Sequence, residues 1–129
     1  MNKQIKSQER KTLYEKSLIY DANLDADGLG TLWHPEGKFQ IASFPQVVGS
    51  QNIAAFFKQF FSYGLFSKWE HEMIEVWDLD DVLIYNAIAI YTRPDGSILK
   101  TPYTNIVKYK DGLFVDYKVF IDTAPLKGA

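Results

Sequence analysis

Cysteine is absent from this chain of 129 residues. Its absence excludes disulfides, thiolate catalysis and zinc sites built on sulfur ligands. Only two histidines are present, at positions 34 and 71, so a transition-metal site is not expected. Long apolar runs are also missing, whereas a membrane-spanning helix needs about 20 consecutive apolar residues. We therefore expect no metal, no cofactor and no membrane partner.

A strong excess of charge is missing too. Sixteen acidic and 14 basic residues give a formal net charge of −2, so no basic surface is available for a phosphate backbone and nucleic-acid binding is not expected. The acidic cluster at 78–81 lacks the spacing of a calcium loop and fits a hairpin turn instead. The first eleven residues lack the apolar stretch of a signal peptide, and we expect a cytoplasmic protein.

Aromatic residues, in contrast, are abundant and make up 16% of the chain. Three tryptophans, eight tyrosines and nine phenylalanines can fill a core and still line a cavity. The length fits one domain over residues 1–129. Apolar residues at 47% and charged residues at 23% are typical of a folded globular chain.

Helical patterns lie in the first half of the chain. Residues 7–24 carry one apolar stripe, residues 25–32 begin with acidic capping residues, and residues 50–64 have the clearest helical spacing. Ser50 can cap this third helix, and Gly64 can end it. The stripe of the first helix consists of Leu13, Ser17, Tyr20 and Leu24.

The second half has the pattern of strands joined by tight turns, after an extended segment at 33–44. Helices followed by an antiparallel meander indicate an α+β fold. We expect three N-terminal helices packed on one face of a strongly curved, mostly antiparallel sheet, with a cone-shaped pocket between them. The meander strands are predicted over residues 69–78, 82–92, 98–109 and 113–122.

Strand alternation predicts which side chains face the interior. Charged residues mark the outside of the last strand, which leaves Tyr117 inside and puts Phe114 and Phe120 outside. The same argument places Asn105 inside the preceding strand. In the first meander strand, Glu70 and Glu72 point outward and His71 inward, so Glu75 points inward unless a bulge intervenes. The 82–92 strand has no charge, and we place Ile84, Asn86, Ile88 and Ile90 inside and Tyr85 and Tyr91 outside.

The predicted interior is apolar and aromatic, with few polar groups. This composition is typical of a small-molecule pocket, although the same groups could bond one another in a filled core. Histidine is the side chain whose ordinary titration falls near neutrality, which makes His71 the best general base inside. The predicted ligand-binding residues are Trp33, Phe57, Asn86 and Tyr117.

Several motifs, in this order and spacing, resemble one family. They are a helix start at 49–53, His71-Glu72 with Trp77, the hairpin at 91–96, and the closing segment at 122–126. The chain resembles the SnoaL-like polyketide cyclases of the nuclear transport factor 2-like superfamily, over nearly its whole length. The resemblance implies a cystatin-like α+β barrel. It leaves the activity open, because the superfamily includes isomerases, cyclases, epoxide hydrolases, dehydratases and non-enzymes.

The resemblance also implies roles for two residues. In ketosteroid isomerase-like members, a tyrosine of the first helix donates to the developing oxyanion, and Tyr20 is similar to it. Asn105 lies near the second donor of that family. The isomerase base falls near Gln40 and Ile41, which cannot take a proton. The positions of the epoxide hydrolase acid and base likewise lack carboxylates; they are similar to Val119, Asn86 and Ile88.

Two functions from different classes follow. The first is an enzyme acting on a small hydrophobic carbonyl or polycyclic compound by enolisation, ring closure or dehydration. Tyr20 and Asn105 then stabilise negative charge, and His71 moves the proton. The second is a non-catalytic small-molecule binder or dimeric interaction module that has lost the acid and base. In either case we expect a homodimer through the outer face of the sheet, as exposed aromatic side chains indicate.

Overall fold

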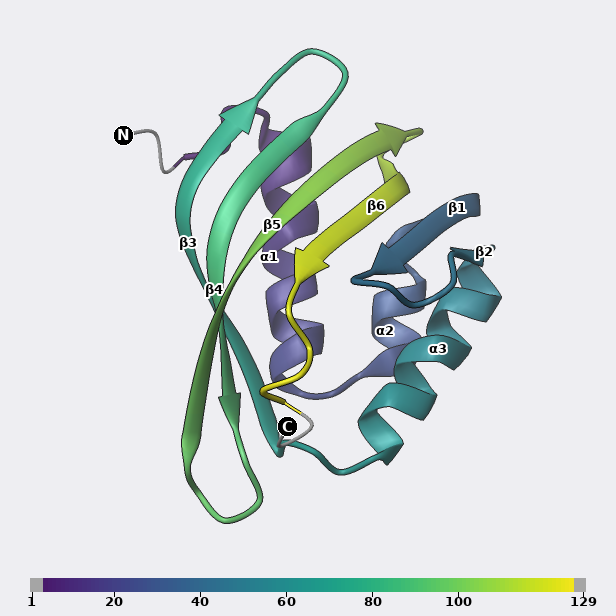
Figure 1. Cartoon of the computed structure of the whole chain (residues 1–129). Coiled ribbons are helices and arrows are strands. Elements are labelled where there is room, and N and C mark those ends of the chain that lie inside the picture. The colour runs from purple at the N-terminus through teal and green to yellow at the C-terminus, as the bar shows by residue number, and fades with distance from the viewer. Residues whose placement is uncertain (1–3, 127–129) are drawn as a thin grey trace.

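A curved six-stranded sheet with three helices on its concave side makes up the computed structural model, which describes residues 4–126 (Figure 1). The α+β architecture with three N-terminal helices is confirmed. In chain order the elements are α1 (Gln8–Ala22), α2 (Ala26–Gly30), β1 (Trp33–Ile41), β2 (Val47–Val48), α3 (Ser50–Ser62), β3 (Lys68–Asp78), β4 (Leu83–Thr92), β5 (Ile98–Lys110) and β6 (Leu113–Ile121).

The strands lie in the order β2-β1-β6-β5-β4-β3. Strands β3 to β6 form the predicted antiparallel meander, and β1 pairs in parallel with β6. The turn between β5 and β6 has positive φ at both Asp111 (53°) and Gly112 (74°). This is the conformation of the tight hairpin turns that Asp-Gly favours. The N-terminal helices are therefore followed by local strand pairings, as the sequence predicts.

Register shifts interrupt three of the ladders. The β1–β6 pair has one between Trp33 and Lys38. Of the two in the meander, the first lies between Met73 and Glu75 of β3, where the sequence offers a bulge as the alternative to an inward Glu75. The second lies in β6, because Lys108 pairs with Asp116 while Tyr109 pairs with Phe114. An extra residue reverses the alternation of side chains beyond it. Phe114 is therefore turned inward and is only 2% exposed, and the prediction that it faces outward is wrong.

The facing of β4 is the reverse of the prediction. Tyr85, Ala87, Ala89 and Tyr91 are buried on the concave side, and the isoleucines that alternate with them lie on the convex side. Both faces of this strand are uncharged, so the sequence offers no charged residue that marks the outside. Asn105 of β5 and Tyr117 of β6 face the concave side as predicted, and Asn105 is only 2% exposed.

Helices α1 and α2 start at residues whose side chains cap them. The Ser7 Oγ accepts a hydrogen bond from the Arg10 backbone N–H (3.3 Å), and the Asp25 carboxylate caps α2 by accepting from Gly28. Helix α3 is preceded by Gly49 at φ 96° rather than capped by the Ser50 side chain.

Helix α1 packs on β3, whereas α3 packs on β1 and α2. The helices thus close the concave side of the sheet.

The start of α1 is fixed to the β3–β4 turn. The Asp78 carboxylate accepts backbone hydrogen bonds from Lys6 and Ser7, both at 2.9 Å, and pairs with Arg10 at 2.5 Å. Arg10 also donates to the Leu79 carbonyl (2.7 Å), and the Asp78 side chain is 5% exposed. We call this group the Asp78 clamp. It gives the acidic turn a structural role.

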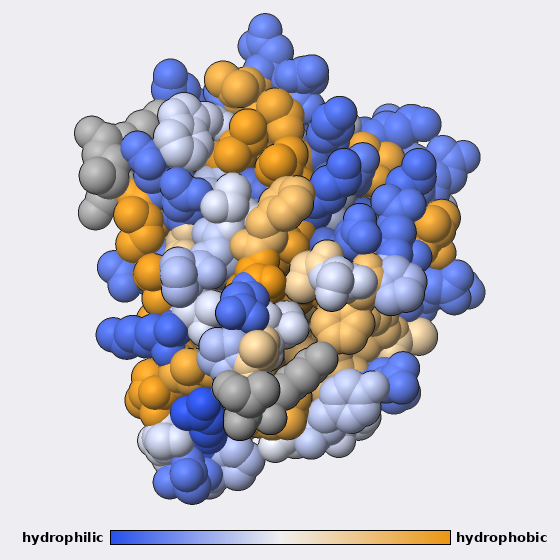
Figure 2. Space-filling model, in the orientation of Figure 1, coloured by the Kyte–Doolittle hydropathy of each residue, from blue (hydrophilic) through white to orange (hydrophobic). Residues whose placement is uncertain are grey.

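No helix within residues 4–126 covers the convex face of the sheet. This face carries the half-buried side chains of Ile84, Ile88, Ile90 and Ile106, together with Phe120, which is 55% exposed. In Figure 2, apolar side chains gather over the upper part of the sheet with charged side chains beside them. Of the four aromatic residues predicted here, only Phe120 is on this face, because Tyr85, Tyr91 and Phe114 are buried inside.

Candidate functional site

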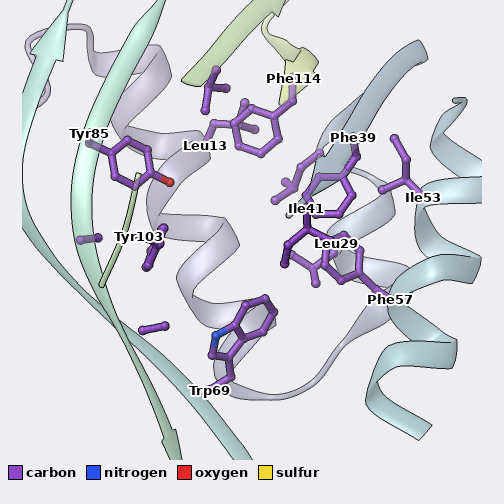
Figure 3. Close-up of a cluster of buried hydrophobic side chains, with 14 of the residues drawn as sticks. Leu13, Leu29, Phe39, Ile41, Ile53, Phe57, Trp69, Tyr85, Tyr103 and Phe114 are labelled. Atoms are coloured by element: carbon purple, nitrogen blue, oxygen red, sulfur yellow. The ribbon is translucent and has the colours of Figure 1, made fainter. Parts of the chain in front are cut away.

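A partly enclosed cavity lies between the concave face of the sheet and α1, with β1 and α3 on the far side. Its volume is about 40 Å³, measured as the space open to the centre of a water molecule. A buried water needs about 10–15 Å³ of such space, so the cavity has room for a few waters. Figure 3 shows Tyr85, Tyr103 and Trp69 on one side and Leu29, Phe39 and Phe57 on the other.

Aromatic rings dominate the walls of the cavity. The Trp33 ring, at the start of β1, contacts the rings of Phe57 of α3 (6.0 Å between centroids) and Tyr117 of β6 (5.2 Å). No lysine or arginine of residues 4–126 lines the cavity. The predicted ligand-binding residues Trp33, Phe57 and Tyr117 all line it. The aromatic lining consists of Tyr14, Trp33, Phe39, Phe57, Trp69, Tyr85, Tyr91, Tyr103 and Tyr117.

Three polar side chains form a chain along one wall. The imidazole of His71 lies between the Asp21 carboxylate (Nε2 to Oδ2, 2.8 Å) and the Tyr103 hydroxyl (Nδ1 to Oη, 2.7 Å). All three side chains line the cavity, and those of His71 and Asp21 are 6% and 12% exposed. Asp21 comes from α1, His71 from β3 and Tyr103 from β5. An acid, an imidazole and a phenol in contact can pass a proton along the chain.

Burial controls the protonation of Asp21 and Tyr103 in this row of contacting side chains. It raises the pKa of the Asp21 carboxyl above its usual value, and the neighbouring His71 offsets part of the rise. Burial also raises the pKa of the Tyr103 phenol well above 10. Tyr103 therefore enters any reaction as a neutral O–H group.

A second polar cluster stands beside the first. Asn105 Nδ2 donates to the hydroxyls of Tyr85 (2.7 Å) and Tyr117 (2.9 Å), which lie 3.0 Å from each other. One tyrosine hydroxyl donates to the other, so one O–H of the pair has no acceptor among these three residues. Burial raises the pKa of Tyr85 to about 12. The cluster thus presents one neutral hydroxyl donor.

The two clusters meet at the rings of Tyr85 and Tyr103, whose centroids are 6.4 Å apart. Sequence reasoning placed His71 and Asn105 inside, and the structure brings them to one cavity. It missed Asp21, Tyr103 and Tyr85 as site residues. The stripe of α1 that faces the cavity is Tyr14, Ser17, Leu18 and Asp21, at helical spacing, and an acid on that stripe was the available signal.

Tyr20 and Asn86 lie elsewhere. Tyr20 does not line the cavity, because it stands one position away from Asp21 around α1. Its ring packs on α2, where a Cβ added at Gly28 would fall 2.5 Å from Tyr20 Cδ1. Asn86 is on the convex face of β4 and accepts a hydrogen bond from the Thr104 hydroxyl (2.6 Å). Neither residue is brought to Asn105 and His71.

The chain belongs to the SnoaL-like domain family, whose model matches residues 20–117. Its fold is that of the nuclear transport factor 2-like and ketosteroid isomerase-like proteins. The family covers proteins of differing chemistry, so membership leaves the reaction open.

Solved structures share the fold at low sequence identity. A candidate isomerase from Bacillus subtilis superposes with a TM-score of 0.77 and 17% identity, over 95% of this chain and 92% of that one. A candidate SnoaL-like polyketide cyclase from Jannaschia sp. CCS1 gives 0.70 and 17%, over 98% and 96%. An epoxide hydrolase-like enzyme from Mycobacterium tuberculosis gives 0.74 and 11%, over 95% and 89%. No curated protein matches the chain.

None of the helices in residues 4–126 is long and apolar enough to cross a membrane.

Proposed function

We propose that the cavity is an active site that moves a proton next to the carbonyl group of a small, uncharged hydrophobic compound. The observation that carries the proposal is the buried contact chain Asp21–His71–Tyr103 beside the hydroxyl cluster of Tyr85 and Tyr117. One side of the cavity can take a proton, and the other can stabilise the oxygen that gains charge. Enolisation of a carbonyl compound needs these two functions together.

The proton path starts at Tyr103. With Nε2 of His71 protonated toward Asp21, Nδ1 is free to accept the Tyr103 O–H. The substrate's α-carbon gives its proton to the Tyr103 oxygen, and the phenolic proton moves to His71 Nδ1. The electron pair of the broken C–H bond forms the C=C bond of the enolate. Asp21 then stabilises the imidazolium, in the way that a buried carboxylate supports a catalytic histidine. Return of the proton to another carbon gives an isomer.

The oxygen of the enolate is stabilised at the second cluster. Asn105 uses Nδ2 to hold the two tyrosines, so the uncommitted tyrosine O–H is the donor that meets the enolate oxygen. A preorganised donor in a site from which water is excluded stabilises such charge more strongly than water does. Asn105 therefore acts through Tyr85 and Tyr117, as a positioning residue rather than as the oxyanion donor expected from the sequence. The names of the isomerase and cyclase relatives are in line with enolate chemistry.

Deuterium exchange tests the proposal. In D₂O, the protein should speed loss of the α-proton NMR signals of small cyclic ketones, with cyclopentanone and cyclohexanone as probes. Tyr103→Phe should lower this rate by about 100-fold or more, because general acid–base groups contribute on the order of 10²–10⁴. Asp21→Asn should lower it as well, since the imidazolium loses its counter-charge.

Matched controls separate chemistry from folding. Tyr63→Phe removes the hydroxyl of a tyrosine that is 60% exposed, and His34→Gln removes the other histidine, which faces Asp111. Both should leave the exchange rate unchanged. Binding of the ketones without any exchange would contradict the enzymatic proposal and favour the alternative, a small-molecule binder.

We also propose that the protein is a homodimer that buries the convex face of the sheet. The support is the row of isoleucines on β4 and β5 with exposed Phe120 beside it. A contiguous apolar patch without a covering layer is typical of a protein interface. The experiment for this proposal is given with the whole molecule in the Discussion.

A further inference from the structure

Four buried polar atoms on residues that line the cavity have no hydrogen-bond partner within residues 4–126. One of them, His71 Nε2, faces the Asp21 carboxylate at 2.8 Å, and another is the indole nitrogen of Trp69. The other two are the side-chain oxygen of Asn105 and the indole nitrogen of Trp33. Asn105 is 2% exposed and Trp33 is 4% exposed, and both line the cavity. Buried polar groups are almost always paired, and each unpaired one calls for an explanation.

The Asn105 oxygen and the Trp33 nitrogen are complementary in hydrogen bonding, and both side chains contact Tyr117. Asn105 contacts the hydroxyl end of Tyr117 (2.9 Å), and the Trp33 ring lies against the Tyr117 ring, with centroids 5.2 Å apart. The Asn105 oxygen is an acceptor, whereas the Trp33 N–H can only donate. A carbonyl oxygen would satisfy the Trp33 donor alone. A hydroxyl group can donate to the Asn105 oxygen and accept from the Trp33 N–H.

The charges in the cavity limit the ligand further. Lysine and arginine are absent from its lining within residues 4–126, and a buried carboxylate, Asp21, is present. A carboxylate or phosphate ligand would meet that acid without a matching cation other than His71. Burying an unpaired charge is strongly unfavourable. The ligand must therefore be uncharged.

The size of the cavity sets an upper limit. About 40 Å³ open to water centres has room for roughly three waters, because one water needs about 10–15 Å³ of such space. A cavity that holds benzene measures about 150 Å³. A single ring therefore enters only when side chains of the walls move apart, and the polycyclic compounds considered from the sequence require a larger displacement.

We propose that the site recognises an uncharged single-ring compound through a hydroxyl group, a phenol or an enol, which donates to Asn105 Oδ1 and accepts from Trp33 Nε1. This inference deepens the proposed function and rests on it in one respect, since an enol forms when the enolate of the proposed reaction takes the proton back on its oxygen instead of on carbon. The site then favours the enol form over the ketone. A ketone leaves the Asn105 oxygen unpaired, whereas an enol pairs it.

Binding of matched ring compounds tests this inference. Phenol, toluene and benzoate have one ring each and differ in the group attached to it. Their dissociation constants can be measured by isothermal titration calorimetry on the whole protein. We expect phenol to bind at least tenfold more tightly than toluene, because only phenol pairs the two buried atoms. Benzoate should bind more weakly than phenol because it is charged.

Variants locate the hydroxyl. Trp33→Phe keeps an aromatic ring and removes the N–H, and Asn105→Leu keeps the side-chain bulk and removes the acceptor. Each should reduce the ratio of the toluene and phenol dissociation constants by about fivefold or more. Trp77→Phe is the matched control, since Trp77 is 41% exposed and lies outside the cavity. If Asn105→Leu fails to fold, as thermal melting would reveal, Trp33→Phe decides the outcome.

The outcomes separate this inference from the proposed function. Phenol has no ketone α-proton to exchange, so its binding does not depend on the Asp21–His71–Tyr103 chain. Equal binding of phenol and toluene overturns the hydroxyl inference, even if ketone exchange is observed. A preference for phenol that survives both variants overturns it as well, because the hydroxyl would then be held elsewhere. Absence of ketone exchange with an intact phenol preference overturns only the proposed reaction.

Discussion

Asp21 is the residue that ties the electrostatics of the cavity to stability. Its buried carboxyl has a raised pKa, so the folded protein holds the proton at pH values where the unfolded chain has already released it. In that window the unfolded state binds fewer protons than the folded state, and stability falls as the pH rises. The loss begins near the ordinary pKa of aspartate, about 3.9, and is complete above the raised value.

The variant Asp21→Asn should remove this pH dependence. The free energy of unfolding of the wild type, minus that of the variant, should decrease as the pH rises from about 4 toward neutrality. The decrease is about 1.4 kcal/mol for each unit by which the folded-state pKa is raised. Urea unfolding at a series of pH values measures it.

The control for this series is Asp81→Asn, which changes an exposed acid of the β3–β4 turn. Its stability should follow that of the wild type over the same pH range. A difference between wild type and Asp21→Asn that grows with pH would mean that burial does not dominate the titration of Asp21.

Single residues also explain which interior positions the sequence predicted and which it missed. His71 and Asn105 were predicted inside because charged neighbours mark the opposite face of their strands. Tyr20 was chosen from a stripe of α1 rotated by about one residue from the one that faces the cavity, which ends in Asp21. An acid is an unexpected residue for an apolar interior, so hydrophobic periodicity alone selects against it.

Among the elements, α1 depends on the Asp78 clamp for its position. The Asp78 carboxylate is nearly buried and has three partners: two backbone N–H groups and Arg10. Loss of one partner from such a group leaves the others unpaired. Asp78→Ala should therefore lower the free energy of unfolding by about 2–3 kcal/mol, as measured by urea denaturation.

Asp80→Ala is the matched control for the clamp. It removes an acid two positions along the same turn, while the backbone carbonyl of Asp80, which accepts from Arg10 at 2.9 Å, is kept. Its effect should stay within about 0.5 kcal/mol, as is usual for exposed positions. Equal effects of the two variants would show that the turn, and not the carboxylate of Asp78, holds α1.

The strands show how far a sequence determines which side chains point to the concave face of the sheet. In β3 the sequence offers a bulge as the alternative to an inward Glu75, and the structure has the bulge. The bulge in β6 left no such signal, since Phe114 is acceptable on either face. In β4 both faces are uncharged, so only packing decides, and the core takes the tyrosines and alanines while the isoleucines remain outside. The register of a strand is strongly specified only where its two faces differ in polarity.

For the whole molecule, the convex face predicts the state of association. Ile88 lies on β4 in the middle of this face, paired with Pro102 of β5 and Glu72 of β3. Size-exclusion chromatography with light scattering should give twice the mass of 14.8 kDa for the wild type. Ile88→Lys should shift it to the monomer mass, because a buried lysine without a partner opposes association.

Ile19→Lys provides the comparison. Ile19 is 59% exposed on α1, away from the sheet face, and the lysine there should leave the mass of the dimer unchanged. A wild-type monomer at tens of micromolar, or a dimer that persists in Ile88→Lys, would contradict the proposed interface.

The order of the elements and the layered architecture follow from periodicity and turn residues, which act locally. The cavity does not, because its polar chain joins three elements that are distant in the sequence: α1, β3 and β5. Asp21 and His71 are 50 positions apart and meet only after the sheet has curved and α1 has packed on it. Contacts of this kind depend on rotation of a helix by a fraction of a turn, which periodicity does not determine.

The division of the Asp21–His71–Tyr103 chain between a helix and the sheet has a consequence for motion. A helix that lifts away by a few ångströms carries the carboxylate off while the imidazole and the phenol stay behind on β3 and β5, which β4 separates. Partial opening between α1 and the sheet would break the Asp21–His71 contact before the sheet unfolds, so the lifetime of the proposed proton path is set by how long α1 stays packed on the sheet.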